Sequence, residues 1–150
     1  MKEIKELKIG DNAPLFSLRD QKGGLVSLAD YKGKKNVVLF FYPGDMTPGC
    51  TMQLCAVRDD VTKFSKKDTV VFGINHGDEE SHSRFVKKHS FPFPLLVDVG
   101  KKISEKYGAI RKYFNIKTIQ RSVVAIDKEG IVVFLKRGMP KNADILKALT

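Results

Sequence analysis

Two cysteines that lie five positions apart, Cys50 and Cys55, are the residues of this chain best suited to chemistry. Cys50 follows an apolar run and a turn rich in proline and glycine, with the sequence YPGDMTPGC. A strand that ends in such a turn and delivers a cysteine to the first turn of a helix favours a thiolate. The second cysteine can react with the first after that thiolate has reacted. The pair therefore indicates thiol redox chemistry.

The start of the predicted helix favours an ionised sulfur at Cys50. Thr47 is the expected N-cap and Pro48 the first helical residue, which places Cys50 near the third position. The first N–H groups of a helix lack partners within the helix, and the helix dipole adds partial positive charge there. A cation would help further, and Arg121 is the leading candidate because it opens a predicted core strand.

Helical spacing also predicts where the two sulfur atoms point. Cys50 lies on an apolar stripe that runs to Phe64, so it should face the sheet at the bottom of a recess. Cys55 lies about 140° further round the helix and should be partly covered by other elements. In an intact helix the two Cα atoms would be about 8.7 Å apart, whereas a disulfide needs less than about 7 Å. A disulfide between them would therefore require part of the helix to unwind.

The elements that must position these cysteines alternate between strands and helices. Apolar runs of strand length span residues 16–18, 25–28, 37–42, 70–74, 95–97, 122–126 and 131–135. Helical periodicity covers 50–64, 82–89 after the cap Asp78, 103–107, and 145–149 after the cap Asn142. This order predicts an α/β protein of three layers, with a mixed central sheet and an N-terminal hairpin, as a single domain over 1–150.

Composition describes an ordinary globular protein of 150 residues, with 42% hydrophobic and 29% charged residues. No apolar run is long enough to cross a membrane. The start of the chain, 1–7, has neither the apolar core nor the cleavage site of a leader, so the cytoplasm is the expected compartment.

Several other kinds of site are disfavoured by residue types and spacing. Two cysteines are too few for a disulfide scaffold, and His76, His82 and His89 match no spacing of zinc ligands. His82 and His89 share an apolar stripe and are expected at the edge of the core. The net charge of +10 is spread over short lysine pairs, which favours a solvated surface over a nucleic-acid interface.

Two alternatives to the favoured chemistry remain open at this point. A thiol–disulfide oxidoreductase of the thioredoxin type would use Cys-x-x-Cys, whereas four residues separate the cysteines here. A basic nucleic-acid-binding module on the same scaffold would require clustered lysine and arginine, and the sequence has no such cluster.

The segment around the first cysteine closely resembles the active-site motif of the peroxiredoxins, Pro-x-x-x-Thr-x-x-Cys. Residues 40–51 read FFYPGDMTPGCT. The second cysteine, with Arg58 and Asp59 after it, is similar to the Q subfamily, also called the bacterioferritin comigratory proteins. Further segments that resemble this subfamily lie at 13–16, 31–33, 93–96 and 121–127.

The resemblance implies a thioredoxin-like fold and a thiol peroxidase for hydrogen peroxide and organic hydroperoxides. Cys50 would be the nucleophile that becomes a sulfenic acid. Thr47 would hydrogen-bond the peroxide and the thiolate, Pro43 would shield the sulfur, and Arg121 would stabilise the thiolate and the departing oxygen. Cys55 would attack the sulfenic acid to give an intramolecular disulfide.

The resemblance also implies partners. Thioredoxin or a similar dithiol protein would reduce the disulfide, and no metal, haem or flavin is needed because sulfur is the redox centre. The subfamily is mostly monomeric, so a monomer is expected, with a dimer as the alternative. One departure stands out. Gln53 replaces the glutamate that the subfamily usually has there to fix the arginine, so Arg121 should be held less firmly or by another acceptor.

Overall fold

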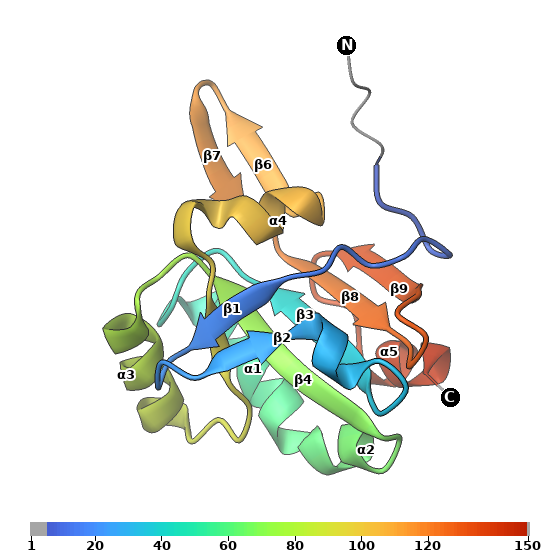
Figure 1. Cartoon of the computed structure of the whole chain (residues 1–150). Coiled ribbons are helices and arrows are strands. Elements are labelled where there is room, and N and C mark those ends of the chain that lie inside the picture. Colours follow the sequence, from blue (N-terminus) through green and yellow to red (C-terminus); the bar gives the residue numbers. More distant parts are fainter. Residues whose placement is uncertain (1–5, 150) are drawn as a thin grey trace.

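A central sheet of seven strands organises the structure, a computed structural model that describes residues 6–149. The strands lie in the order β2-β1-β5-β4-β3-β8-β9 (Figure 1). Their bounds are β1 Ser17–Asp20, β2 Leu25–Ser27, β3 Asn36–Phe41, β4 Thr69–Asn75, β5 Leu95–Val97, β8 Ser122–Ile126 and β9 Val132–Arg137. All seven predicted strands are therefore present.

The sheet is mixed, as predicted. Strands β3, β4 and β5 are parallel to one another, and β8 pairs with β3 in the antiparallel sense. The hairpin β1–β2 joins the sheet through the antiparallel pair of β1 with β5. This hairpin is the predicted N-terminal extension, and the structure places it at one edge of the sheet.

Helices and loops cover both faces of the sheet. The helices are α1 Pro48–Asp59, α2 Val61–Ser65, α3 Glu79–His89, α4 Lys102–Lys106 and α5 Asn142–Ala148, with short 3-10 turns at Leu28–Tyr31 and Val99–Lys101. Alternate side chains of β3 enter two apolar clusters: Val37 packs with residues of the N-terminal segment and α4, and Val38 packs with residues of α1, α3 and α5. Because β3 is buried on both faces, it forms the middle of three layers.

The predicted helix over 50–64 is wrong in one respect, because it is two helices. Asp60 lies between α1 and α2 with φ −104° and ψ 10°, outside the helical region. Its carbonyl oxygen accepts the Lys63 N–H at 2.9 Å, so the residue ends one helix and begins the next. Asn142 is likewise not the N-cap of α5 but its first residue. Its amide donates to the Ala56 carbonyl and the Asp60 carboxylate instead.

The second predicted hairpin, over 122–135, is present as β8–β9, but a further hairpin was not predicted. Strands β6 Ile110–Tyr113 and β7 Ile116–Ile119 form a separate two-stranded sheet, and Figure 1 shows it standing out from the rest of the molecule. Most of its residues are exposed on both faces, so no apolar alternation marks it in the sequence.

Two further expectations concern a leader at the start of the chain and a membrane span. The first five residues lie outside the described part of the chain, and with them most of the segment in which no leader was recognised. Within residues 6–149, no helix is long and apolar enough to span a membrane.

Candidate active site

The loop that follows β3 positions Cys50. The strand is buried throughout and ends at Phe41, and a loop over 43–47 leads into α1. Thr47 occupies the N-cap position, Pro48 opens the helix, and Cys50 is its third residue. The start of the helix is therefore where the sequence predicted it. The Thr47 hydroxyl, however, does not cap the helix, because it donates to the Gly44 carbonyl at 2.9 Å.

Arg121 lies against the Cys50 sulfur, which is fully buried. Its Nη2 donates to Cys50 Sγ at 3.2 Å. Strand pairing explains this contact. Phe41 of β3 is opposite Ser122 of β8, so the preceding residue, Arg121, comes to the end of β3 from which the active-site loop departs. The cation predicted from its place before a core strand is thus beside the thiol.

Gly49 provides the space for this guanidinium. A Cβ atom at position 49 would lie 3.1 Å from Arg121 Nη2, closer than most Cβ contacts. The first turn of α1 consequently approaches Arg121 as closely as it does because it carries a glycine there. The glycine in this motif has a steric role beyond that of a turn residue.

Gln53 holds the other side of the same guanidinium. Its Oε1 accepts from Arg121 Nη1 at 2.8 Å, so the acceptor is Gln53 itself, one turn after Cys50, and not another residue. The side chain is buried. Its Nε2 has no hydrogen-bond partner, and no other buried side-chain nitrogen or oxygen atom of residues 6–149 lacks one. The glutamine thus fixes Arg121 without charge and leaves one buried donor unsatisfied, which is usually costly.

Cys55 lies on the same helix but does not contact Cys50. Helix α1 is continuous from Pro48 to Asp59, both cysteines are free thiols, and Cys55 is half-buried against the second apolar cluster. In such a helix the two Cα atoms are about 8.7 Å apart. The structure brings Arg121 to Cys50 and keeps Cys55 beyond disulfide reach.

A cavity of about 360 Å³ is lined by Arg121, the residue that contacts the thiol, although Cys50 itself does not line it. Pro43 and Arg121 form its wall on the active-site side, and Arg111 and Tyr113 of the β6–β7 hairpin contribute another part. The hairpin that the sequence did not predict therefore lines a cavity next to Arg121. Pro43 is exposed at the border of this cavity.

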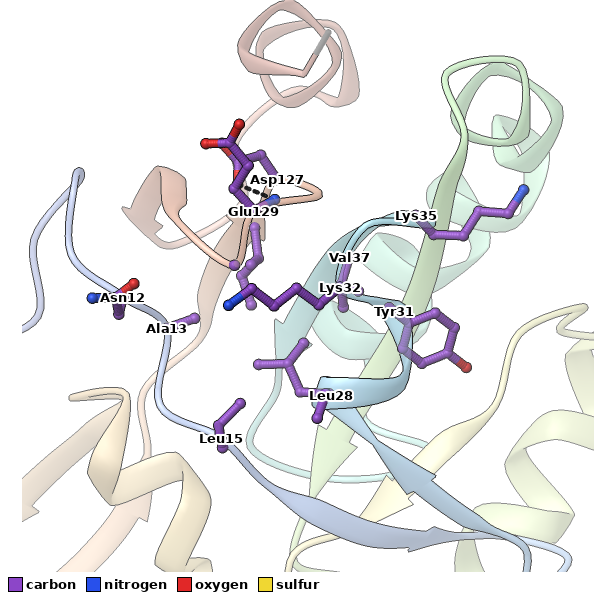
Figure 2. A pocket seen from close by; sticks show the side chains of 13 residues that line it. Asn12, Ala13, Leu15, Leu28, Tyr31, Lys32, Lys35, Val37, Asp127 and Glu129 are labelled. Carbon is purple, nitrogen blue, oxygen red and sulfur yellow. Dashed lines mark hydrogen bonds between the residues drawn. The ribbon is translucent and has the colours of Figure 1, made fainter.

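A second cavity, of about 420 Å³, lies at the opposite end of β3 (Figure 2). Val37 near the start of β3 and Ile126 at the end of β8 line it, whereas Cys50 follows the other end of β3. Figure 2 shows the Lys32 side chain extending across it between Leu28 and the turn that carries Glu129. This cavity includes neither cysteine and is separate from the site.

A buried polar network that the sequence did not reveal adjoins the active-site loop. Asp45 accepts hydrogen bonds from the Tyr42 hydroxyl and the Ser81 hydroxyl, each at 2.6 Å, and its Oδ2 is 2.6 Å from His82 Nδ1. His82 is fully buried, so its expected place at the edge of the core is wrong. Asp45 and His82 are 37 positions apart, and no local motif links them.

Burial alone would raise the pKa of Asp45, but its surroundings have the larger effect. Hydrogen bonds from His82, Ser81 and Tyr42, with the charge of His82, lower the pKa of Asp45 below its usual value. Burial and the neighbouring Asp45 carboxylate raise the pKa of Tyr42 well above its usual value. Asp45 is therefore an ionised acceptor and Tyr42 a neutral donor at neutral pH.

No candidate metal centre accompanies these residues. Within residues 6–149, no three His, Cys, Asp or Glu side chains form a group that could hold a metal ion. The site consists of a buried thiol, a guanidinium and an amide at the start of a helix, on a thioredoxin-like mixed sheet.

Comparison with known proteins gives the family. Residues 9–135 match the model of the AhpC/TSA family. The chain is 42% identical over 147 residues to peroxiredoxin Bcp of Bacillus subtilis, covering 95% of this chain and 93% of that protein. It is 44% identical over 126 residues to the chloroplastic peroxiredoxin Q of Oryza sativa subsp. japonica, covering 84% of this chain but only 57% of that relative.

Solved structures agree with this relationship. A crystal structure of peroxidoxin BcpB from Mycobacterium tuberculosis superposes with a TM-score of 0.87 at 30% identity, covering 95% of this chain and 96% of that one. A crystal structure of PrxQ from Xylella fastidiosa also gives 0.87, at 25% identity and 95% coverage of both chains. The fold is thus the thioredoxin-like fold of the peroxiredoxins. The chain belongs to the AhpC/TSA family, among its peroxiredoxins of the Q and Bcp type.

Proposed function

We propose that this protein is a thiol peroxidase in which Cys50 reduces hydrogen peroxide and organic hydroperoxides. The Cys50 thiolate attacks the terminal oxygen of the peroxide, the O–O bond breaks, and the remaining oxygen leaves with the electron pair and takes up a proton. The sulfur is oxidised to a sulfenic acid and the peroxide is reduced to water or an alcohol. The observation that carries this proposal is the 3.2 Å contact of Arg121 Nη2 with the buried Cys50 sulfur.

The other predicted residues have roles consistent with their positions. Arg121 stabilises the thiolate and the negative charge on the departing oxygen, because Gln53 fixes its guanidinium beside the sulfur. Free N–H groups in the first turn of α1, around Gly49 and Cys50, supply further donors. The Thr47 hydroxyl donates to Gly44, so its oxygen is an acceptor for the peroxide proton. Pro43 borders the cavity next to Arg121 and limits access of water.

Cys55 completes the cycle in this proposal. Its thiol attacks the Cys50 sulfenic acid, water leaves, and an intramolecular disulfide forms. Because both residues lie in one continuous helix, α1 must unwind locally before the sulfur atoms can meet. A dithiol protein such as thioredoxin then reduces the disulfide by thiol exchange. Such a reductant requires a reducing compartment, which we propose to be the cytoplasm, with the protein acting as a monomer.

Peroxide consumption coupled to thioredoxin, thioredoxin reductase and NADPH tests the proposal. Wild type should oxidise NADPH when peroxide is added, and Cys50→Ser should not. Peptide mapping after one equivalent of peroxide should find a Cys50–Cys55 bond in a monomer-sized species. NADPH oxidation by the Cys50→Ser variant at the wild-type rate would contradict the role of Cys50.

The Cys55→Ser variant tests the second step separately. It should consume one equivalent of peroxide as wild type does, and its Cys50 should then progress to sulfinic acid under excess peroxide. If wild type forms only intermolecular disulfides, the resolving role of Cys55 is wrong even though the peroxidase step stands.

A further inference from the structure

The active-site loop is attached to the core by a buried carboxylate. Asp45 lies in the loop between β3 and α1, and its side chain is only 5% exposed. It accepts three hydrogen bonds: from Tyr42, directly after β3, and from Ser81 and His82 in the first turn of α3. The loop that leads to Cys50 is therefore fixed to two different elements of the core.

Each ring nitrogen of His82 faces oxygen acceptors. Nδ1 faces Asp45 Oδ2 at 2.6 Å. Nε2 faces two backbone carbonyls, that of Leu96 at 3.0 Å and that of Asn75 at 3.3 Å. A carboxylate only accepts, so Nδ1 is the donor to Asp45. His82 and the Asp45 carboxylate thus form a buried, charge-assisted hydrogen bond.

The space around the pair is closely matched to it. A Cβ atom at Gly77 would lie 3.1 Å from Asp45 Oδ2, 3.2 Å from His82 Cε1 and 3.0 Å from Asn75 Oδ1. Asn75 in turn donates to the Tyr42 carbonyl at 2.8 Å. Any side chain at position 77 would therefore crowd the carboxylate and the imidazole, and the glycine allows the backbone to pass this close to the pair.

The loop held by this network is strained. Met46 follows Asp45 and has a φ of 63°, in the left-handed region that residues other than glycine seldom adopt. Such a conformation persists only when its surroundings over-determine it. Asp45 is fixed on one side of Met46, and on the other Thr47 is fixed by its hydrogen bond to Gly44 and by the first hydrogen bond of α1.

From these contacts we infer that His82 is a positioning residue for the peroxidase reaction. Through Asp45 it holds the strained loop over 43–47, and the loop in turn fixes Pro43, Thr47 and the start of α1 around the Cys50 sulfur. The inference rests on the proposed function. It assigns to the start of α3 a role in keeping the reduced site in its folded form.

Substitution of His82 with phenylalanine tests this role, because phenylalanine retains a ring but donates no hydrogen bond. His82→Phe should lower kcat/KM for hydrogen peroxide by at least about tenfold, since small displacements of reacting groups have effects of this size. His82→Gln should lose less, because its amide can still donate to Asp45, but it should stay below the control, because one amide cannot also reach the Leu96 carbonyl on the far side of the ring. His89→Phe is the matched control: His89 lies on the same helix and contacts Phe85 and Phe91 through its ring, so its kcat/KM should stay within about twofold of wild type.

Two measurements separate positioning from mere destabilisation. In reduced protein, hydrogen–deuterium exchange over 43–47 should be faster in His82→Phe than in His89→Phe. The pH profile of Cys50 alkylation by iodoacetamide, recorded with Cys55→Ser as background, should also change in His82→Phe only. Urea unfolding of each variant shows whether it is folded in the assay, and His82→Gln decides the matter if His82→Phe does not fold.

The inference is overturned if folded His82→Phe, or folded His82→Gln in its place, matches His89→Phe in kcat/KM, loop exchange and alkylation profile. It is also overturned if activity falls only in proportion to the unfolded fraction. If wild type itself reduces no peroxide, the proposed function fails instead. Loop exchange and alkylation still measure the anchoring of the loop in that case.

Discussion

The contact between Arg121 and the thiol depends on how small residue 49 is. Gly49 precedes Cys50 in the helix, and its Cα faces the guanidinium that donates to the sulfur. Gln53 fixes that guanidinium from the next turn with a neutral oxygen. Arg121, fixed by Gln53 and given room by Gly49, thus determines the electrostatic environment of a sulfur that is fully buried.

Substitution of Gly49 with alanine should therefore lower both stability and activity. Alanine favours the helix over glycine by up to about 1 kcal/mol, but loss of the Arg121 bonds to Cys50 and Gln53 costs about 1 kcal/mol each, so the free energy of unfolding should fall by about 1 kcal/mol. The new Cβ, 3.1 Å from Arg121 Nη2, should displace the guanidinium, and kcat/KM for peroxide should fall about tenfold because a charge-stabilising donor is moved. Urea unfolding and steady-state peroxide assays measure the two quantities.

The control for this variant is a glycine-to-alanine change far from the sulfur. Gly24 lies in the β1–β2 hairpin, where a Cβ would meet only the Asp20 carboxylate. Gly24→Ala should keep wild-type activity. A Gly49→Ala protein that is as active as Gly24→Ala would show that Arg121 has room to move without cost.

At the scale of elements, the sequence predicted the parts of the site that local rules control. The buried strand, the turn and the helix start follow from apolar runs and from Thr47 and Pro48. The place of Arg121 follows from its position before a strand that pairs with β3. Each of these features depends on neighbours in the chain or on one strand pair.

Other features could not be read from the sequence because they depend on tertiary contacts. The pairing of Asp45 with His82 requires α3 to pack beside the active-site loop. The β6–β7 hairpin has no buried face, so its sequence carries no periodic signal. The break at Asp60 and the place of Asn142 have a common cause, because the two side chains bond to each other across the junction of α1, α2 and α5.

The bond between Asn142 and Asp60 gives a prediction for the stability of this junction. Asn142→Ala should lower the free energy of unfolding by about 1 kcal/mol at neutral pH. The hydrogen bond from Asn142 lowers the pKa of Asp60, partial burial acts against it, and Lys63 lowers it further. A depressed carboxyl pKa stabilises the fold fully above the unfolded value of about 3.9, and this contribution is lost as pH falls through the folded value.

The difference between wild type and Asn142→Ala should consequently be larger at pH 7 than at about pH 3. Urea unfolding at both values measures it. Asn115→Ala, in the turn of the β6–β7 hairpin, is the matched control and should give a difference that does not change with pH. A pH-independent difference for Asn142→Ala would mean that its bond to the Ala56 carbonyl carries the effect instead.

At the scale of the whole molecule, the fold allows α1 to unwind locally while the central sheet stays folded. The first apolar cluster packs on the face of the sheet opposite α1 and contains no residue of that helix. Helix α1 contributes Cys50, Leu54 and Val57 to the second cluster only. Local unwinding between the cysteines would thus expose part of one cluster and leave the other face of the sheet covered.

This arrangement predicts that the oxidised protein is less stable than the reduced one, although it gains a covalent bond. A disulfide that closes so short a loop stabilises by roughly 2 kcal/mol through the unfolded chain. Against this, unwinding exposes Leu54, which costs about 2 kcal/mol. It also breaks the bonds of Arg121 to Cys50 and to Gln53, and each of these two bonds contributes about 1 kcal/mol. The helix hydrogen bonds that are lost add a similar cost per bond. The free energy of unfolding should therefore fall by at least about 2 kcal/mol on oxidation.

Urea unfolding of protein treated with one equivalent of peroxide, compared with the reduced form, tests this balance. The midpoint should fall, and so should the slope of free energy against urea, because the oxidised form already exposes surface that the reduced form buries. Dithiothreitol should restore both values, and Cys50→Ser should show neither change. An oxidised form with a higher midpoint and an unchanged slope would contradict this prediction, because it would mean that α1 stays folded around the disulfide. In an intact helix the two Cα atoms are roughly 8.7 Å apart, which is too far for a disulfide.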